Sequence, residues 1–178
     1  GRERSFGDTL LTDTPGQSSA TEPHLTEQAL KALVYGTSQA TGAQFLRAFV
    51  RELARACSVR HAFVGELIPS DPTILRITAH WHGTDWGPVF DYRLAQSPAE
   101  VTLRNGEALY PVHLQASFPD DSHSAALGGE SSAGGSVRNA AGEPLGVVFL
   151  LDTAPLPQAT FCLSLLKLFS GRAGAELE

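Results

Sequence analysis

The chain has 178 residues, of which 42% are hydrophobic and 18% are charged, and its formal net charge is −6. This composition is typical of a folded globular protein, and the length suits one domain with a short extension. Lysine and arginine are scattered along a mildly acidic sequence, so we expect no direct binding to nucleic acid. The longest apolar run, residues 147–151, is far shorter than a membrane-spanning helix, so we expect no membrane partner.

Residues 1–21 are rich in Gly, Ser, Thr and Asp and are expected to form a linker or leader, followed by one domain over residues 22–178. The first helix of that domain is predicted to start at Thr21–Glu22–Pro23 and to end near Gly36. A second helix is predicted from Thr41 to Cys57, because apolar residues recur there every four positions.

Three strands are then predicted, over residues 59–68, 73–82 and 88–94, the first two joined by a Pro-Ser-Asp-Pro turn. The second strand alternates between a mixed face, which includes His80 and His82, and an apolar face. The two histidines could contribute to a metal site, but no third ligand is evident and none is expected. The apolar face is predicted to carry four residues: Leu75, Ile77, Ala79 and Trp81.

A short helix is predicted over residues 97–105, with Ser97 as its N-cap and Glu100 at the capping-box position, before a short strand at 108–112. Residues 113–129 are predicted to be an irregular lid or binding loop. Within it, Asp120 and Asp121 are better explained as a turn or helix cap than as an acid–base pair, because neighbouring loop residues diverge and no nucleophile accompanies them.

The last two strands, 132–138 and 145–151, are predicted to form a hairpin, with Gly134 and Gly135 allowing close packing, before a closing helix that contains Phe161. Short connections favour an antiparallel arrangement. The predicted fold is therefore α+β: an antiparallel sheet of five to six strands, with the N- and C-terminal helices on one face and the loops and short helix on the other.

Cys57 and Cys162 each lie among apolar residues in segments predicted to be helical. A disulfide framework or a zinc site would need more ligands at closer spacing. We therefore expect two buried, reduced thiols, as in a cytoplasmic protein. The chain contains no methionine, so we expect it to be part of a longer protein whose output domain lies outside this sequence.

The order of these elements resembles that of the GAF domains of bacterial signalling proteins, over roughly residues 25–178. The resemblance implies a GAF-like, non-catalytic sensory domain that binds a small molecule between the sheet and the loops. Ala99 stands where many related domains carry a cysteine, and Ser132 and Ser136 stand where an aromatic and a proline are frequent. The phrases that carry the resemblance are Phe118–Pro119–Asp120–Asp121, Gly129–Glu130–Ser131 and the segment 141–152.

Aromatic side chains gather in the middle strands, and aromatics with a polar atom are well suited to small-molecule pockets. Ordinary core packing is the alternative for the same residues. The predicted function is ligand sensing with relay through the terminal helices; the alternative is a dimerisation module without a ligand, which would self-associate through those helices. Neither a cofactor nor the identity of the ligand can be predicted. The candidate ligand-binding residues are Trp81, Trp86, Phe90, Tyr92, His113, Phe118 and Ser131.

Overall fold

The computed structural model describes residues 42–177. The predicted linker and the predicted first helix lie outside the described residues. The described elements, in chain order, are α2 (Gly42–Cys57), β1 (His61–Ile68), β2 (Asp71–Trp81), β3 (Phe90–Arg93), α3 (Pro98–Asn105), β4 (Glu107–Tyr110), α4 (Leu114–Ser117), α5 (Ser122–Ala126), β5 (Ser131–Arg138), β6 (Pro144–Asp152) and α6 (Ala159–Leu177).

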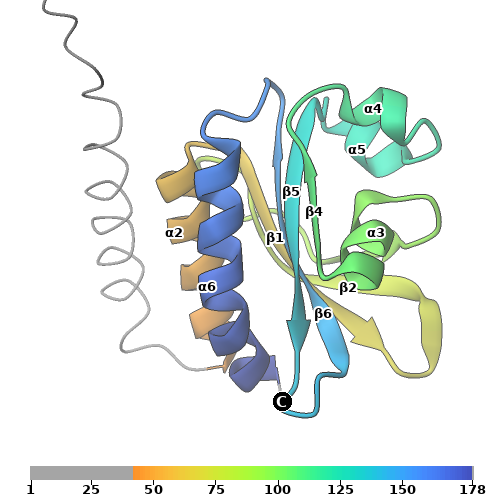
Figure 1. Ribbon diagram of the computed structural model, residues 1–178, viewed down its shortest axis with the longest axis vertical. Coiled ribbons are helices and arrows are strands. Elements are labelled where there is room, and N and C mark those ends of the chain that lie inside the picture. The colour runs from red at the N-terminus through yellow and green to blue at the C-terminus, as the bar shows by residue number, and fades with distance from the viewer. Residues whose placement is uncertain (1–41, 178) are drawn as a thin grey trace, which may run out of the picture.

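The strands form one six-stranded sheet in the order β3-β2-β1-β6-β5-β4, in which all neighbours are antiparallel. Helices α2 and α6 cover one face of the sheet, and α3, α4 and α5 lie on the other (Figure 1). The predicted α+β fold, with its sheet and its two layers, is therefore confirmed. None of the described helices is long and apolar enough to span a bilayer.

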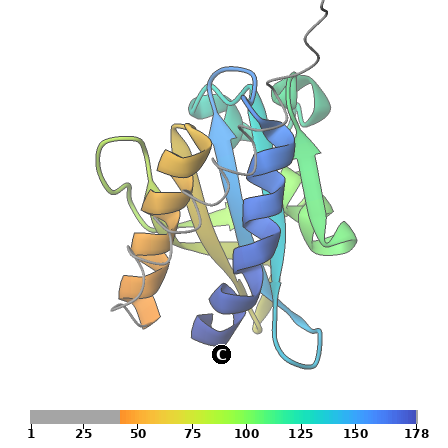
Figure 2. The same ribbon diagram turned by 60° about the vertical axis from the view of Figure 1, so that its left-hand side comes forward.

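Helices α2 and α6 lie side by side on the sheet and run in opposite directions (Figure 2). The start of α2 meets the end of α6, where the Gly42 amide donates to Glu176 Oε2 at 2.6 Å. The end of α2 meets the start of α6, where Cys162 Sγ is 3.9 Å from the Cys57 carbonyl oxygen. The fourfold spacing that predicted α2 puts Phe45, Phe49 and Leu53 on its fully buried face.

Two apolar clusters fill the two sides of the sheet. The first joins α2 and α6 to the sheet and includes Phe45 and Leu165. The second lies under α3, α4 and α5 and is built around Phe63, Tyr92 and Phe149. Strand β1 contributes to both, because successive side chains alternate between the two faces.

A β-bulge in β2 corrects the prediction that Leu75, Ile77, Ala79 and Trp81 share one face. Val64 of β1 pairs with Ala79, but the next residue, Gly65, pairs with Ile77, so that Thr78 is an extra residue in β2. The extra residue reverses the alternation. Leu75 and Ile77 therefore belong to the cluster under α3–α5, whereas Ala79 and Trp81 belong to the cluster under α2 and α6.

The adjacent glycines of β5 allow a helix to approach each face of the sheet. A Cβ atom at Gly134 would lie 2.7 Å from Thr102 Oγ1 of α3, and one at Gly135 would lie 3.2 Å from Ser170 Oγ of α6. The prediction that these glycines serve close packing is confirmed.

The segment 113–129 is more regular than predicted, because it contains the two short helices α4 and α5. The Asp121 side chain caps α5 by accepting from the Ser124 amide at 3.2 Å, which confirms the predicted cap. The capping of α3 is also as predicted, since Ser97 Oγ accepts from the Glu100 amide and Gly106 ends the helix in the left-handed conformation.

Candidate functional site

A row of stacked rings crosses the face of the sheet that α3, α4 and α5 cover. Phe63 of β1 lies at its centre, with the Phe149 ring on one side at 4.5 Å and the His80 ring on the other at 4.2 Å. Both neighbouring rings are within 19° of parallel to it. The bulge in β2 is what brings His80 to this face, next to residues of β1 and β6.

His61 and His80 form a buried pair at the end of this row. His61 Nδ1 is 3.1 Å from His80 Nε2, and each side chain is 5% exposed. At that distance one of the two nitrogens carries the proton of a hydrogen bond and the other accepts it. His80 Nδ1 has no hydrogen-bond partner within the described part of the chain. The backbone of Gly87 lies directly against this ring, where a Cβ atom would collide with it.

Burial keeps this imidazole pair neutral. Desolvation, followed by the positive charge of Arg60, lowers the pKa of His61 to about 4. Desolvation, followed by repulsion from His61, lowers the pKa of His80 to about 3. At neutral pH the pair therefore offers uncharged donors and acceptors rather than positive charge.

A hollow of about 460 Å³ opens beside this pair. Its floor includes both histidines, and His82, whose ring is 5.8 Å from that of His80, lies in the wall. Arg60 adds a cationic side chain at the rim, where it is exposed. The remaining lining residues come from the β2–β3 connection, the end of α5 and the segment after β6: Pro88, Ala126, Leu127 and Thr153.

A second hollow, of about 520 Å³, is lined by residues of β3, of α5 and of the turn before α5. Ala126 of α5 lines both hollows, so the two are neighbours. Two residues that line the second hollow, Tyr92 and Asp121, belong to a hydrogen-bond network. The Tyr92 hydroxyl and the Ser124 hydroxyl each donate to Asp121 Oδ2 at 2.5 Å. Desolvation and the neighbouring carboxylate raise the pKa of Tyr92, so the phenol stays protonated.

His123 connects α5 to the sheet. Its ring stacks on Phe90 of β3 at 4.1 Å and 14°. Burial lowers the pKa of His123, and the Asp121 carboxylate opposes that shift. The short helix is thus held by one ring stack and one carboxylate network.

The structure does not bring all seven predicted ligand residues together. Phe90 and Tyr92 lie at the aromatic face, as expected. Trp81 and Trp86 lie on the opposite side of the sheet, where their rings are 5.0 Å apart in the cluster under α2. The Arg47 guanidinium covers Trp86 at 4.4 Å.

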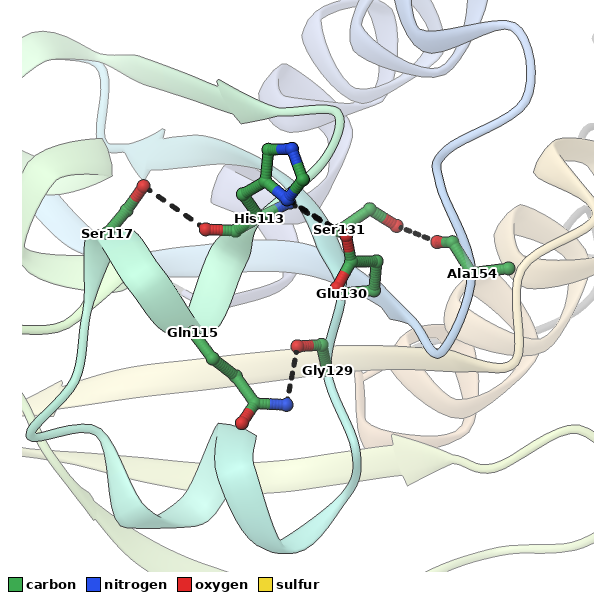
Figure 3. Close-up of polar contacts among 7 residues, drawn as sticks. All are labelled: His113, Gln115, Ser117, Gly129, Glu130, Ser131 and Ala154. Atoms are coloured by element: carbon green, nitrogen blue, oxygen red, sulfur yellow. Dashed lines mark hydrogen bonds and ion pairs between the residues drawn. The ribbon is translucent and has the colours of Figure 1, made fainter.

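The other three predicted residues lie near α4 and the start of β5. Figure 3 shows the His113, Glu130 and Ser131 side chains close together. The His113 amide donates to Glu130 Oε1 at 3.0 Å, and the Ser131 hydroxyl donates to the Ala154 carbonyl oxygen at 2.7 Å. Phe118 packs edge-on against Tyr110. These contacts fix the position of α4. None of the three residues lines either hollow.

Sequence reasoning did not select His61, Arg60 or His123 as site residues. His61 alternates with Phe63 and therefore shares its face, which was a usable signal. His123 had none, because its position depends on α5, which was predicted to be irregular. The described residues contain no group of three or more His, Cys, Asp or Glu side chains placed to hold a metal.

Comparisons with known proteins give the class of fold. No protein-family model and no curated protein matches the chain. Among solved structures, it is similar to the GAF domain of an Acinetobacter phosphoenolpyruvate-protein phosphotransferase, with a TM-score of 0.63 at 12% identity over 88% of this chain and 92% of that one. It is also similar to a GAF domain of A. aeolicus solved in an inactive state, with a TM-score of 0.61 at 15% identity over 88% and 95% of the two chains.

A third similar structure is the chromophore-binding domain of a Stigmatella aurantiaca phytochrome, with a TM-score of 0.59 at 14% identity. That match covers 88% of this chain and 61% of the other. The chain therefore has the fold of a GAF domain.

Proposed function

We propose that this domain is a non-catalytic sensory module of a bacterial signalling protein, which binds a small molecule beside α5. The observation that carries the proposal is the hollow of about 460 Å³ lined by His61, His80 and His82. A small number of polar groups at the edge of an aromatic cluster is a common composition for a ligand site. Several GAF-fold neighbours are themselves chromophore-binding domains, which gives the proposal a precedent in the fold.

Strand β1 offers a route from this site to the helices. His61 and Phe63 face the hollow and the ring row, whereas Ala62 and Val64 of the same strand belong to the cluster under α2 and α6. A ligand that moves β1 would therefore change the packing of both helices. We propose that the signal leaves the domain through this helix pair.

The test is a thermal-shift screen of nucleotides, haem and bilins, followed by calorimetry on any compound that raises the Tm. The variants are His82→Ala and Arg60→Ala, and the matched control is His113→Ala, an exposed histidine outside both hollows. Binding that is lost in the first two variants and kept in the control supports the site. If no compound stabilises the wild-type protein, the sensing proposal fails.

A dimerisation module without a ligand is the second candidate. It is favoured by the fully buried Phe63, Leu75 and Ile77, which occupy much of the space under α3–α5 with the protein's own side chains. It is also favoured by Leu168 of α6, which is 59% exposed on the helix layer. Light scattering of the wild type and of Leu168→Asp tests it: a dimer that the variant abolishes supports it, and a monomer at high micromolar concentration contradicts it.

A further inference from the structure

The two cysteines of the chain, 105 residues apart in sequence, meet where the helix pair is joined. Cys57 is the last residue of α2, and Cys162 lies in the first turn of α6. Cys162 Sγ is 3.9 Å from the Cys57 carbonyl oxygen and 3.8 Å from that of Pro157. Both are free thiols within the same apolar cluster, Cys57 being 2% exposed and Cys162 fully buried. The sequence predicted two buried thiols, but their separation gave no sign that they are neighbours.

Cys162 Sγ lies within reach of the Cys57 backbone, and the interaction between the two side chains raises the pKa of Cys57. The same interaction lowers the pKa of Cys162, against the opposing effect of its burial. Cys162 is therefore the sulfur that ionises first, and Cys57 is already beside it to react in a second step. A thiolate next to a second thiol is the arrangement from which an intramolecular disulfide forms.

The backbone beside each cysteine is in an unusual conformation. Ser58, which follows Cys57, and Gln158, which immediately precedes α6, both have φ of 54°. Left-handed backbone at a residue other than glycine costs free energy, so the packing around each cysteine must hold these two junctions in place.

We propose that Cys57 and Cys162 are a peroxide-sensitive dithiol, whose oxidation to a disulfide ties the end of α2 to the start of α6. A small, uncharged peroxide is the oxidant that suits a pair so little exposed. This inference does not depend on the proposed ligand or its site, which lies on the other face of the sheet.

The reaction has two balanced steps. The Cys162 thiolate attacks one oxygen of hydrogen peroxide, an S–O bond forms, the O–O bond breaks, and the leaving hydroxide takes up the proton that the thiol released. The sulfur of Cys57 then attacks the sulfenic acid, an S–S bond forms and the S–O bond breaks, and the second hydroxide leaves as water with the Cys57 proton. Two thiols are oxidised, and one peroxide is reduced to two waters.

The two cysteines are 105 residues apart, so the disulfide would close a long loop, and the entropy that it removes from the unfolded chain grows slowly with loop length. The oxidised protein is therefore expected to melt about 5 to 15 °C higher than the reduced protein. It would also fix the relative position of the two helices that cover one face of the sheet.

The test treats the reduced 178-residue protein with hydrogen peroxide and follows intact mass and alkylation under denaturing conditions. The expected product is a monomer lighter by two hydrogens, which takes up no iodoacetamide until dithiothreitol is added. The rise in Tm should appear and disappear with the disulfide. The proposal is overturned if both thiols remain alkylatable after prolonged treatment, if sulfinic or sulfonic acid accumulates instead, or if the disulfide links two chains.

Two variants assign the order of attack. Cys57→Ala should trap a sulfenic acid on Cys162, which dimedone labels, whereas Cys162→Ala should react at least about tenfold more slowly. Equal rates in the two variants would contradict the assignment of Cys162 as the attacking sulfur. The wild-type measurement stands by itself if either variant fails to fold.

Discussion

At the scale of single residues, the hydroxyl of Tyr92 has a role that can be measured. It donates to the Asp121 carboxylate in a buried environment, at 2.5 Å. A hydrogen bond to a charged group contributes more than a neutral one, so Tyr92→Phe should lower the free energy of unfolding by about 1 to 3 kcal/mol. Urea denaturation measures the change.

Tyr110→Phe is the matched control for this prediction, because Tyr110 packs edge-on against Phe118, whereas the cap of α5 is made by Asp121. Its effect should be smaller by at least about 1 kcal/mol. Equal losses in the two variants would mean that the bond to Asp121 contributes nothing specific.

The buried histidine pair predicts how stability depends on pH. The pKa values of His61 and His80, about 4 and about 3, lie below the ordinary value of 6.5. Between about pH 4 and pH 6.5, these two histidines bind more protons in the unfolded chain than in the folded protein. Their contribution to stability is therefore fully present above pH 6.5 and is lost as the pH is lowered towards 4. We expect a loss of ~2–4 kcal/mol between about pH 6.5 and 4.5.

Carboxylates also titrate at the lower end of this range, so the measurement is a comparison of variants. His80→Gln should show a shallower dependence of the unfolding free energy on pH than the wild type. His113→Gln, at an exposed position, should keep the wild-type slope. A slope that is the same in all three proteins would contradict the assignment to the buried pair.

At the scale of single elements, two glycines of α6 provide a matched pair of substitutions. Gly171 has nothing within 4 Å of the position that a Cβ atom would take, so Gly171→Ala should stabilise the protein by about 0.5 to 1 kcal/mol through helix propensity. At Gly174 the same atom would collide with the Arg138 carbonyl oxygen at the end of β5. Gly174→Ala should therefore destabilise it by about 1 to 3 kcal/mol.

Thermal denaturation of both variants checks this prediction. Because the two positions are three residues apart in one helix, helix propensity is the same for both and only packing on the sheet differs. Stabilisation by both substitutions would mean that α6 does not lie so close to β5.

The elements also show which features of the fold were predictable from sequence. Helix α2, the capped helix α3 and the β5–β6 hairpin depend on local signals, such as fourfold apolar spacing and Ser97, and they were predicted correctly. The faces of β2 were not, because the bulge at Thr78 depends on how β1 pairs with β2, which local alternation does not encode.

The candidate site was less predictable than the fold for the same reason. Phe90 and Tyr92 lie together at the aromatic face, because they are two residues apart in a regular strand; their role in binding a ligand stays a prediction. Trp81 follows the bulge and faces the opposite side, where Trp86 joins it. His61 and His80 meet only through pairing between two strands, and the pairing of Cys57 with Cys162 depends on two helices crossing the sheet in opposite directions.

At the scale of the whole molecule, the two layers that cover the sheet differ in what holds them. Helices α2 and α6 have 16 and 19 residues and bury apolar faces against the sheet. In contrast, α4 and α5 have 4 and 5 residues, and α5 is held by the stack on Phe90 and by the Asp121 network. Any ligand that enters beside α5 would therefore meet the least stable part of the fold.

Hydrogen exchange of backbone amides can test this difference between the layers. Residues 114–126, which include α4 and α5, should exchange at least about tenfold faster than β1 and β6. Asp121→Ala removes the carboxylate that accepts from Tyr92 and Ser124, so exchange in this segment should rise about tenfold further, with β1 and β6 unchanged.

Asp120→Ala is the control for this variant, since Asp120 is the exposed neighbour that lines the same hollow. Its exchange pattern should match the wild type. If Asp121→Ala speeds exchange equally throughout the sheet, the carboxylate supports the whole fold and α5 does not open separately. Faster exchange confined to residues 114–126 would mean that α4 and α5 can open while the sheet and the α2–α6 layer stay folded, as ligand entry beside α5 requires.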